Sequence, residues 1–194
     1  ANVAGSGEDA QQALVDIGGV ELLVSTLNVH VDESAVQASG CRAFANLAGY
    51  RAEYRDAVLK AGAISCVLAA MRSHPTDLSV QMYGCAALAS IAMGSFERKA
   101  AIARAGGLQQ VAVSLRMHTA NAEVQLHACR AIANLAAQSV ENQASAVQSG
   151  VVDSIVVALR VHANNAMVQE AAWLALGFLA GDTSSARAAI VDAG

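Results

Sequence analysis

Proline, aromatic residues and excess positive charge are all scarce in this 194-residue chain. It contains one proline, Pro75, and 4% aromatic side chains, whereas 55% of its residues are hydrophobic. This composition favours helices that pack closely through small side chains. Twelve Lys and Arg against 16 Asp and Glu give a net charge of -4, which argues against a protein that neutralises nucleic-acid phosphates or anionic lipid.

A long hydrophobic run is also missing. The longest uncharged run, residues 78–96, contains Ser79, Gln81 and Ser90, so it indicates a soluble helix and no membrane span. The first residues lack the charged-then-apolar pattern of a signal peptide, and no Asn-x-Ser/Thr sequon occurs. We therefore expect a cytoplasmic protein, with the nucleus as the alternative location.

An internal repeat of 44 residues organises the sequence. The dipeptide Val-Gln recurs at this spacing, beginning at Val36, Val80, Val124 and Val168. Glycine keeps the same register at positions 18, 62, 106, 150 and 194. Periods of this length are typical of helical armadillo and HEAT repeats. The sequence therefore predicts a solenoid in which each repeat buries part of its neighbour.

Each repeat contains the signals of three helices. In the repeat at 49–92 we expect helices over 53–61, 64–72 and 78–92. Gly62 follows the first of them, where glycine adopts a positive φ without steric cost. The chain is interrupted before the third helix, which Asp77 or Ser79 is placed to cap.

Several segments resemble the armadillo-repeat family. Residues 36–48 and 124–136 resemble the third helix of an armadillo repeat, and residues 57–64 and 190–194 resemble the end of its first helix. The resemblance covers essentially the whole chain and implies an all-α, right-handed superhelical solenoid of three-helix repeats. The boundaries that it implies are full repeats at 5–48, 49–92, 93–136 and 137–180, the end of a preceding repeat at 1–4, and a partial repeat at 181–194.

Cysteine recurs at one repeat position, at Cys41, Cys85 and Cys129. Stacked helices lie about 8–10 Å apart, which is too far for a disulfide or for ligands that share one zinc ion. We expect these three thiols, and Cys66 on a second helix, to be buried and unpaired.

Histidine and arginine recur at the end of the predicted second helices. The residues are His30, His74, His118 and His162, together with Arg72, Arg116 and Arg160. We expect these side chains to bond the last carbonyls of those helices and to complement the helix dipole. The alternative is a ridge that binds an acidic partner.

A further basic group lies in the predicted first helices and is interleaved with aromatic residues. It consists of Arg51, Arg55, Lys60, Arg98, Lys99 and Arg104. Such a pattern can indicate nucleic-acid binding, but acidic residues interrupt it and the later repeats do not maintain it, so we expect a solvated outer face. No phosphate-binding loop, His-Glu-x-x-His or Gly-x-Ser-x-Gly motif is present. The sequence predicts no enzyme, no cofactor and no metal site.

The armadillo resemblance also implies a concave groove lined by the third helices. In peptide-binding members, a Trp and an Asn four residues later project into this groove, and the Asn amide bonds an extended peptide backbone. The Asn position here holds Asn2, Asn46, Ser90, Asn134 and Phe178, and the Trp position holds Arg42, Ala86, Arg130 and Leu174. The predicted partner-binding residues are Ser39, Arg42, Asn46, Tyr83, Ser90, His127, Arg130, Asn134, Leu174 and Phe178.

These substitutions change the expected ligand. Arginine at the Trp position departs from the pattern by which nuclear-import receptors hold basic side chains, and it favours a carboxylate or a phosphate. We therefore expect an acidic or phosphorylated protein segment as the partner, and neither nucleic acid nor a membrane. The alternative for Asn46 and Asn134 is that they only bond the neighbouring repeat.

The sequence thus predicts a non-catalytic scaffold that binds a partner segment along the groove. Two alternatives stay open: a structural array that stacks end to end or is built into a larger assembly, and the regulatory segment of a larger multidomain protein. Neither end shows the polar capping repeat of a complete solenoid, so we expect an excerpt of a longer array with ends that can associate with a neighbouring copy.

Overall fold

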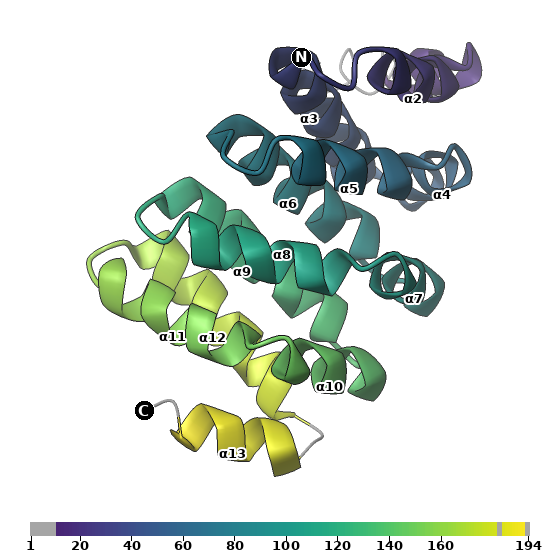
Figure 1. Cartoon of the computed structure of the whole chain (residues 1–194). Coiled ribbons are helices and arrows are strands. Elements are labelled where there is room, and N and C mark those ends of the chain that lie inside the picture. Colours follow the sequence, from purple (N-terminus) through teal and green to yellow (C-terminus); the bar gives the residue numbers. More distant parts are fainter. Residues whose placement is uncertain (1–10, 182–183, 193–194) are drawn as a thin grey trace, which may run out of the picture.

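The computed structural model describes residues 11–181 and 184–192, which are helical with short connections and contain no β-strand (Figure 1). The predicted all-α architecture is confirmed. Residues 11–16 are helical. The helices that follow are α2 (Gly19–Val29), α3 (Ser34–Tyr50), α4 (Ala52–Lys60), α5 (Ala63–Ser73), α6 (Leu78–Ala92), α7 (Phe96–Arg104), α8 (Gly107–Met117), α9 (Ala122–Ala136), α10 (Val140–Gln148), α11 (Val151–Val161), α12 (Ala166–Ala180) and α13 (Ser184–Asp192). Residues 1–4, expected to end a preceding repeat, lie outside the described residues.

Three helices recur in a fixed order. The helices α4, α5 and α6 have 9, 11 and 15 residues, and the next two sets, α7–α9 and α10–α12, have the same lengths. We call α4, α7, α10 and α13 the first helices, α2, α5, α8 and α11 the second helices, and α3, α6, α9 and α12 the third helices. In Figure 1 the sets stack from α2 and α3 to α13, with α4, α7 and α10 along one side.

The sequence signals for the helix ends act as expected. Gly62, Gly106 and Gly150 adopt φ values of 85°, 84° and 73° between a first and a second helix, as predicted. Asp77 caps α6, because its carboxylate accepts hydrogen bonds from the backbone N–H groups of Ser79 and Val80. The bond from Val80 lowers the pKa of Asp77, so this cap is charged at neutral pH.

The core lies between the second and third helices and depends on small side chains. Gly84 on α6 illustrates the close approach, because an added Cβ atom would lie 2.5 Å from Cγ of Met71 on α5. Cys41, Cys85 and Cys129 are fully buried and unpaired, and Cys66 is buried and unpaired as well. The prediction for the four thiols is confirmed, and burial raises the pKa of Cys85 to about 12.

The recurrent glutamine of the Val-Gln pairs joins the second helix to the third in each repeat. Gln81 Nε2 donates to the carbonyl oxygens of Met71, at 2.7 Å, and His74, at 3.0 Å, at the carboxyl end of α5. The same two bonds are made by Gln37, Gln125 and Gln169. These carbonyls lie at a helix end, where the helix itself supplies no donor. The amide supplies a donor to Met71 O, and a second one to His74 O, which also accepts from the backbone N–H of Asp77.

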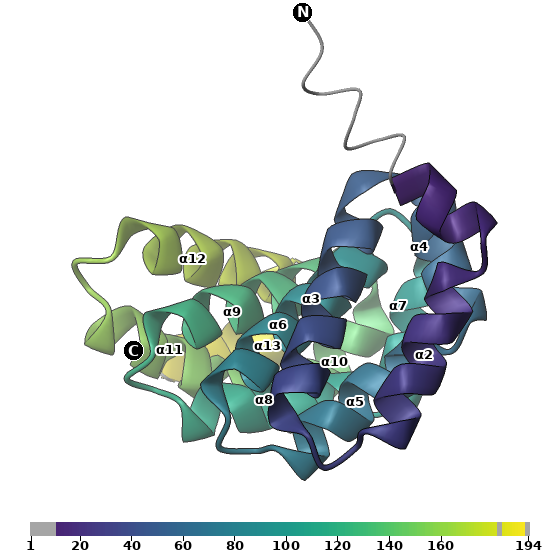
Figure 2. The same cartoon turned by 90° about the horizontal axis from the view of Figure 1, so that it is seen from above.

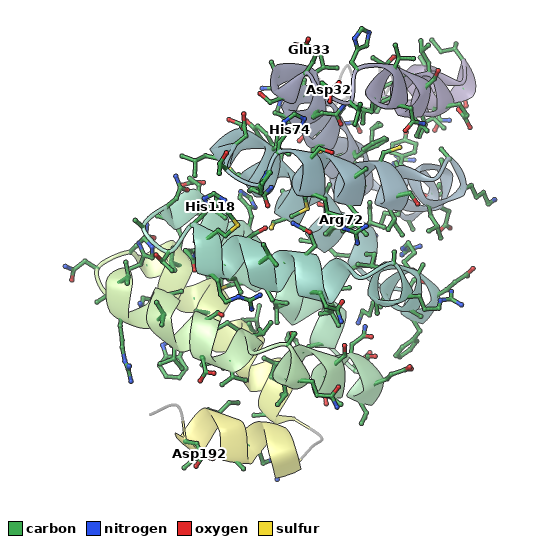
Figure 3. The ribbon with its side chains drawn as sticks, in the orientation of Figure 1. Asp32, Glu33, Arg72, His74, His118 and Asp192 are labelled. Carbon is green, nitrogen blue, oxygen red and sulfur yellow. The ribbon has the colours of Figure 1, made fainter. Side chains whose placement is uncertain are left out.

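The histidines bond a different set of carbonyls from the one we predicted. His74 Nε2 lies 2.7 Å from the carbonyl oxygen of Val31, and His118 Nε2 lies 2.8 Å from that of Pro75, in each case in the preceding repeat. Figure 3 labels both histidines. His162 contacts Thr119 O in the same way. The prediction that these side chains bond their own helix ends is therefore wrong, because the glutamines already occupy those carbonyls.

The arginines beside them extend toward the following repeat. Arg72 on α5 donates to the carbonyl oxygen of Ala105, at 3.0 Å, and Arg116 on α8 donates to that of Ser149, at 3.1 Å. Both carbonyls lie at the carboxyl end of a first helix. The arginines thus bond last carbonyls as expected, but those of the next repeat. The histidines and arginines together tie α5 and α8 to both of their neighbouring repeats.

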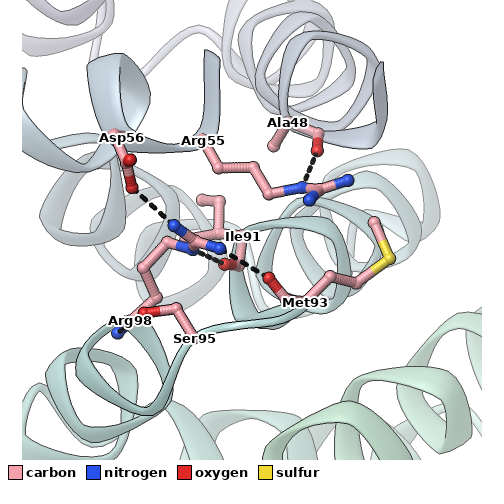
Figure 4. Close-up of polar contacts among 7 residues, drawn as sticks. All are labelled: Ala48, Arg55, Asp56, Ile91, Met93, Ser95 and Arg98. Atoms are coloured by element: carbon pink, nitrogen blue, oxygen red, sulfur yellow. Dashed lines mark hydrogen bonds and ion pairs between the residues drawn. The ribbon is translucent and has the colours of Figure 1, made fainter. Parts of the chain in front are cut away.

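Arg98 connects a first helix to the third helix before it (Figure 4). Its guanidinium donates to the carbonyl oxygens of Ile91, at 2.9 Å, and Met93, at 2.6 Å, and pairs with Asp56. The side chain of Arg98 is 6% exposed. The carboxyl end of α6 therefore receives its donors from α7.

Lys99 and Arg55, also on first helices, donate hydrogen bonds to carbonyl oxygens near the ends of third helices. Lys99 is buried and its Nζ donates to the carbonyl oxygen of Ala137, whereas Arg55 Nε donates to that of Ala48, as Figure 4 shows. The expectation of a solvated outer face is therefore wrong for Arg98 and Lys99. Free carbonyls at the ends of the third helices draw these cations inward.

Candidate functional site

The third helices form one continuous face. The helix α6 packs against α3 and α9, and α9 packs against α12, so the four helices lie side by side (Figure 2). A cavity of about 410 Å³ crosses all four. Its lining consists of Ala45, Asn46, Ala86, Ala89, Ser90, Met93, His127, Arg130, Asn134 and Leu174. We call this cavity the groove.

Six of the ten predicted binding residues meet in the groove: Asn46, Ser90, His127, Arg130, Asn134 and Leu174. A neighbouring cavity of about 300 Å³ is lined by Asn134 and Phe178. Ser39, Arg42 and Tyr83 lie on the third helices outside both linings. The structure therefore brings most of the predicted set together, although their role in binding stays a prediction.

Asn134 shows how a groove residue can also serve the framework. Its Nδ2 donates to the carbonyl oxygen of Ala89 on α6 at 2.9 Å, which is the contact with a neighbouring repeat that we gave as the alternative. A side-chain amide carries a second N–H and an acceptor oxygen. Asn134 can therefore hold the adjacent repeat and still present hydrogen-bonding groups to a ligand.

Charge in the groove comes from α9. Arg130 is exposed, whereas the neighbouring His127 is half-buried. Burial and the positive charge of Arg130 lower the pKa of His127, and Glu123 acts in the opposite direction. The imidazole is therefore neutral at pH 7, and Arg130 is the cationic residue of the groove lining.

Sequence reasoning missed several residues at the edge of the groove. Lys99, Met93 and Gln138 line the smaller cavity with Asn134 and Phe178. Gln138 adopts a φ of 56°, which is rare for a residue other than glycine, and its counterpart one repeat earlier is Gly94, with a φ of 72°. The alignment of Gln138 with Gly94 was the available signal, because it places a side chain where the backbone favours glycine.

No group of three or more His, Cys, Asp or Glu side chains among the described residues is placed to hold a metal ion. No single helix in the described ranges is long and apolar enough to cross a membrane. The pair α10 and α11 meets that criterion by length and composition only, and it bends by 74°.

Solved structures provide the comparison with known proteins. A crystal structure of an engineered protein is 38% identical to this chain, covers 96% of it and has a TM-score of 0.84. A second engineered protein is 32% identical, covers 96% of the chain and 74% of its own length, and has a TM-score of 0.85. A crystal structure of computationally designed armadillo repeat proteins for modular peptide recognition is 26% identical over 96% of the chain and 75% of its own length, with a TM-score of 0.82.

The chain spans 43% of the length of the first of these proteins. No protein-family model and no curated protein sequence matches this chain.

Proposed function

Since the chain is an armadillo-repeat solenoid, we propose that it is a non-catalytic scaffold that binds an extended segment of a partner protein along the groove. The observation that carries the proposal is the cavity of about 410 Å³ that crosses all four third helices. An extended segment rises about 3.3 Å per residue, and stacked helices lie about 10 Å apart. About three residues of a partner therefore span each repeat.

The charge of the groove supports an acidic or phosphorylated segment. Arg130 lines the groove, and Arg42 lies outside the lining at the corresponding position two repeats earlier, about 20 Å away. Acidic residues about six positions apart in the partner suit both arginines. The apolar side chains of Ala86 and Ala89 lie between them and favour a small apolar residue at the centre of the segment.

The test is a binding titration with acidic, neutral and basic versions of one peptide library, read by fluorescence anisotropy. We expect the acidic peptides to bind most tightly and to lose affinity with added salt, because exposed charges are screened over about 8–10 Å at physiological ionic strength. The Arg42→Ala/Arg130→Ala double variant should weaken acidic binding. Preference for basic peptides, or unchanged acidic binding by the double variant, would reject the proposal.

Self-association is a second candidate function, and an exposed aromatic residue favours it. The ring of Trp173 on α12 is 61% exposed, and large apolar side chains at a surface favour contacts between proteins. A third helix of another copy could cover this ring. Sedimentation should then detect a concentration-dependent dimer that Trp173→Ser weakens, and a monomer at all concentrations would reject the candidate.

A further inference from the structure

Arg42 and Arg130 hold the same repeat position but have different surroundings. The guanidinium of Arg42 lies 5.7 Å from the ring centroid of Tyr83 on the following third helix, in a cation–π contact. The residue that corresponds to Tyr83 for Arg130 is Ala171, which is buried and has no ring. Arg130 also lines the groove, whereas Arg42 does not. Arg42 is therefore already engaged, and Arg130 faces the groove.

A second nitrogen donor accompanies Arg130. His127 lies three residues before it on α9, on the same helix face, and lines the same cavity. The position of His127 holds Ser39 on α3, Tyr83 on α6 and Ala171 on α12. Among the four third helices, α9 alone combines histidine and arginine at these two positions.

We infer that His127 and Arg130 form the subsite of the groove that binds an anionic side chain of the partner, either a carboxylate or a phosphate. The inference rests on the proposed function and makes it more specific, because it assigns the anion to α9. Arg130 supplies a forked pair of N–H donors, and His127 adds one ring N–H. Leu174, Ala86 and Ala89 beside them provide an apolar floor for the neighbouring partner residue.

Binding at this subsite should be linked to protonation of His127. Glu123 and Arg130 are the charges that act on the imidazole from its own helix. The helices that pack against α9 carry the other titratable groups, which are Tyr83 and Cys85 on α6, Glu97, Arg98, Lys99 and Arg104 on α7, Arg116 on α8, Glu141 on α10 and Glu170 on α12. The shift of the His127 pKa is caused by burial, Arg130 and Glu123.

The sign of this linkage follows from the charge of the ligand. Burial and Arg130 keep the free imidazole neutral at pH 7, whereas a bound anion stabilises its charged form and raises its pKa. Affinity for an anion therefore increases as the pH falls, by at most about tenfold per pH unit for one linked proton.

The experiment uses the tightest-binding glutamate peptide from the library, because its carboxylate does not titrate between pH 5.5 and 8. Affinity is measured over this range for the wild-type chain and for His127→Gln, Arg130→Ala and Arg42→Ala. Isothermal titration in two buffers with different ionisation enthalpies counts the protons taken up. A phosphoserine version of the same peptide, measured at pH 8, compares the phosphate with the carboxylate, and a glutamine version is the uncharged control.

We expect Arg130→Ala to weaken binding at least about tenfold, since charge-assisted bonds of this kind contribute about 1.5–3 kcal/mol. Arg42→Ala should have a smaller effect. His127→Gln, which keeps a donor but cannot titrate, should abolish both the pH dependence and the proton uptake. An equal or larger loss with Arg42→Ala, or a wild-type pH profile identical to that of His127→Gln, would overturn the inference while leaving the groove as a peptide site. Absence of binding by every peptide would instead reject the proposed function itself.

Discussion

The interior of the stack and its groove face use the same repeat in opposite ways. Buried positions of the stack tend to keep one residue type, as the four glutamines that begin with Gln37 and the three cysteines that begin with Cys41 show. The position of His127 on the third helices changes from repeat to repeat, because it holds Ser39, Tyr83 and Ala171 in the other three. The recurrent glutamines donate hydrogen bonds to the end of a neighbouring helix, and the recurrent cysteines pack in the core. The variable side chains line the groove or lie beside it. We therefore propose that recurrence at a buried position marks framework and that variation on the groove face marks recognition.

The largest expected effect is a loss of stability at alkaline pH, which arises from the interior of the stack. Burial raises the pKa of Cys41, Cys85 and Cys129 to about 12, so the folded state keeps these thiols neutral. Their stabilising contribution is complete below the unfolded pKa of about 8.5 and is lost as the pH rises toward 12, at roughly 1.4 kcal/mol per thiol and pH unit. Burial raises the pKa of Cys66 as well. Urea unfolding between pH 8 and 10 should show this loss of stability, and Cys85→Ala should reduce its slope by roughly a quarter to a third. An unchanged slope would contradict the assignment.

The glutamines should show that the contribution of a framework side chain to the free energy of unfolding depends on its burial. Gln81→Ala removes the donor for Met71 O and His74 O and should lower the free energy of unfolding by about 2–4 kcal/mol. Gln169→Ala removes the same kind of bonds at a half-buried position, where water can replace them, so its cost should be smaller. Urea denaturation of both variants measures the difference. Equal costs would show that burial does not control the contribution of this amide.

The side-chain oxygen of Gln81 has a hydrogen-bond donor that the corresponding oxygen of Gln125 lacks. This difference allows a matched pair of substitutions. Ser114 Oγ donates to Gln81 Oε1 at 2.6 Å, whereas the corresponding residue for Gln125 is Ala158, and Gln125 Oε1 is buried without a partner. Ser114→Ala should destabilise the protein by about 1 kcal/mol or more, and Ala158→Ser should stabilise it by up to about 1 kcal/mol. Thermal unfolding tests both signs, and stabilisation by Ser114→Ala would be inconsistent with this account.

A smaller effect is expected at the edge of the groove. Gln138 has a φ of 56° where Gly94 has one of 72° in the preceding repeat. Gln138→Gly removes the steric cost of the left-handed conformation and should stabilise the protein by about 0.5 kcal/mol after the entropy loss of glycine. Differential scanning calorimetry, with Gly94→Ala as the opposite substitution, measures it. Destabilisation by Gln138→Gly would mean that this side chain makes a contact that outweighs the strain.

Much of the fold could be predicted from the sequence because its signals are local. The predicted helices in residues 49–92 differ from the structure by one residue at most, since Gly62 and Asp77 fix their ends. The contacts of the histidines and of Arg98 could not be predicted, because their partners are backbone carbonyls in other helices and carry no sequence signature. The groove residues were found by their repeat position, whereas the engagement of Arg42 by Tyr83 depends on the separation of the helices.

The most direct test of the central claim is an NMR titration of the backbone amides with the acidic peptide. The account predicts that chemical-shift changes concentrate on α3, α6, α9 and α12, around Asn46, Ser90 and Arg130. The amides of the second helices α5 and α8, whose last carbonyls accept hydrogen bonds from Gln81 and Gln125, should change little. Changes concentrated on α5, α8 and α11 instead would contradict the assignment of recognition to the groove face.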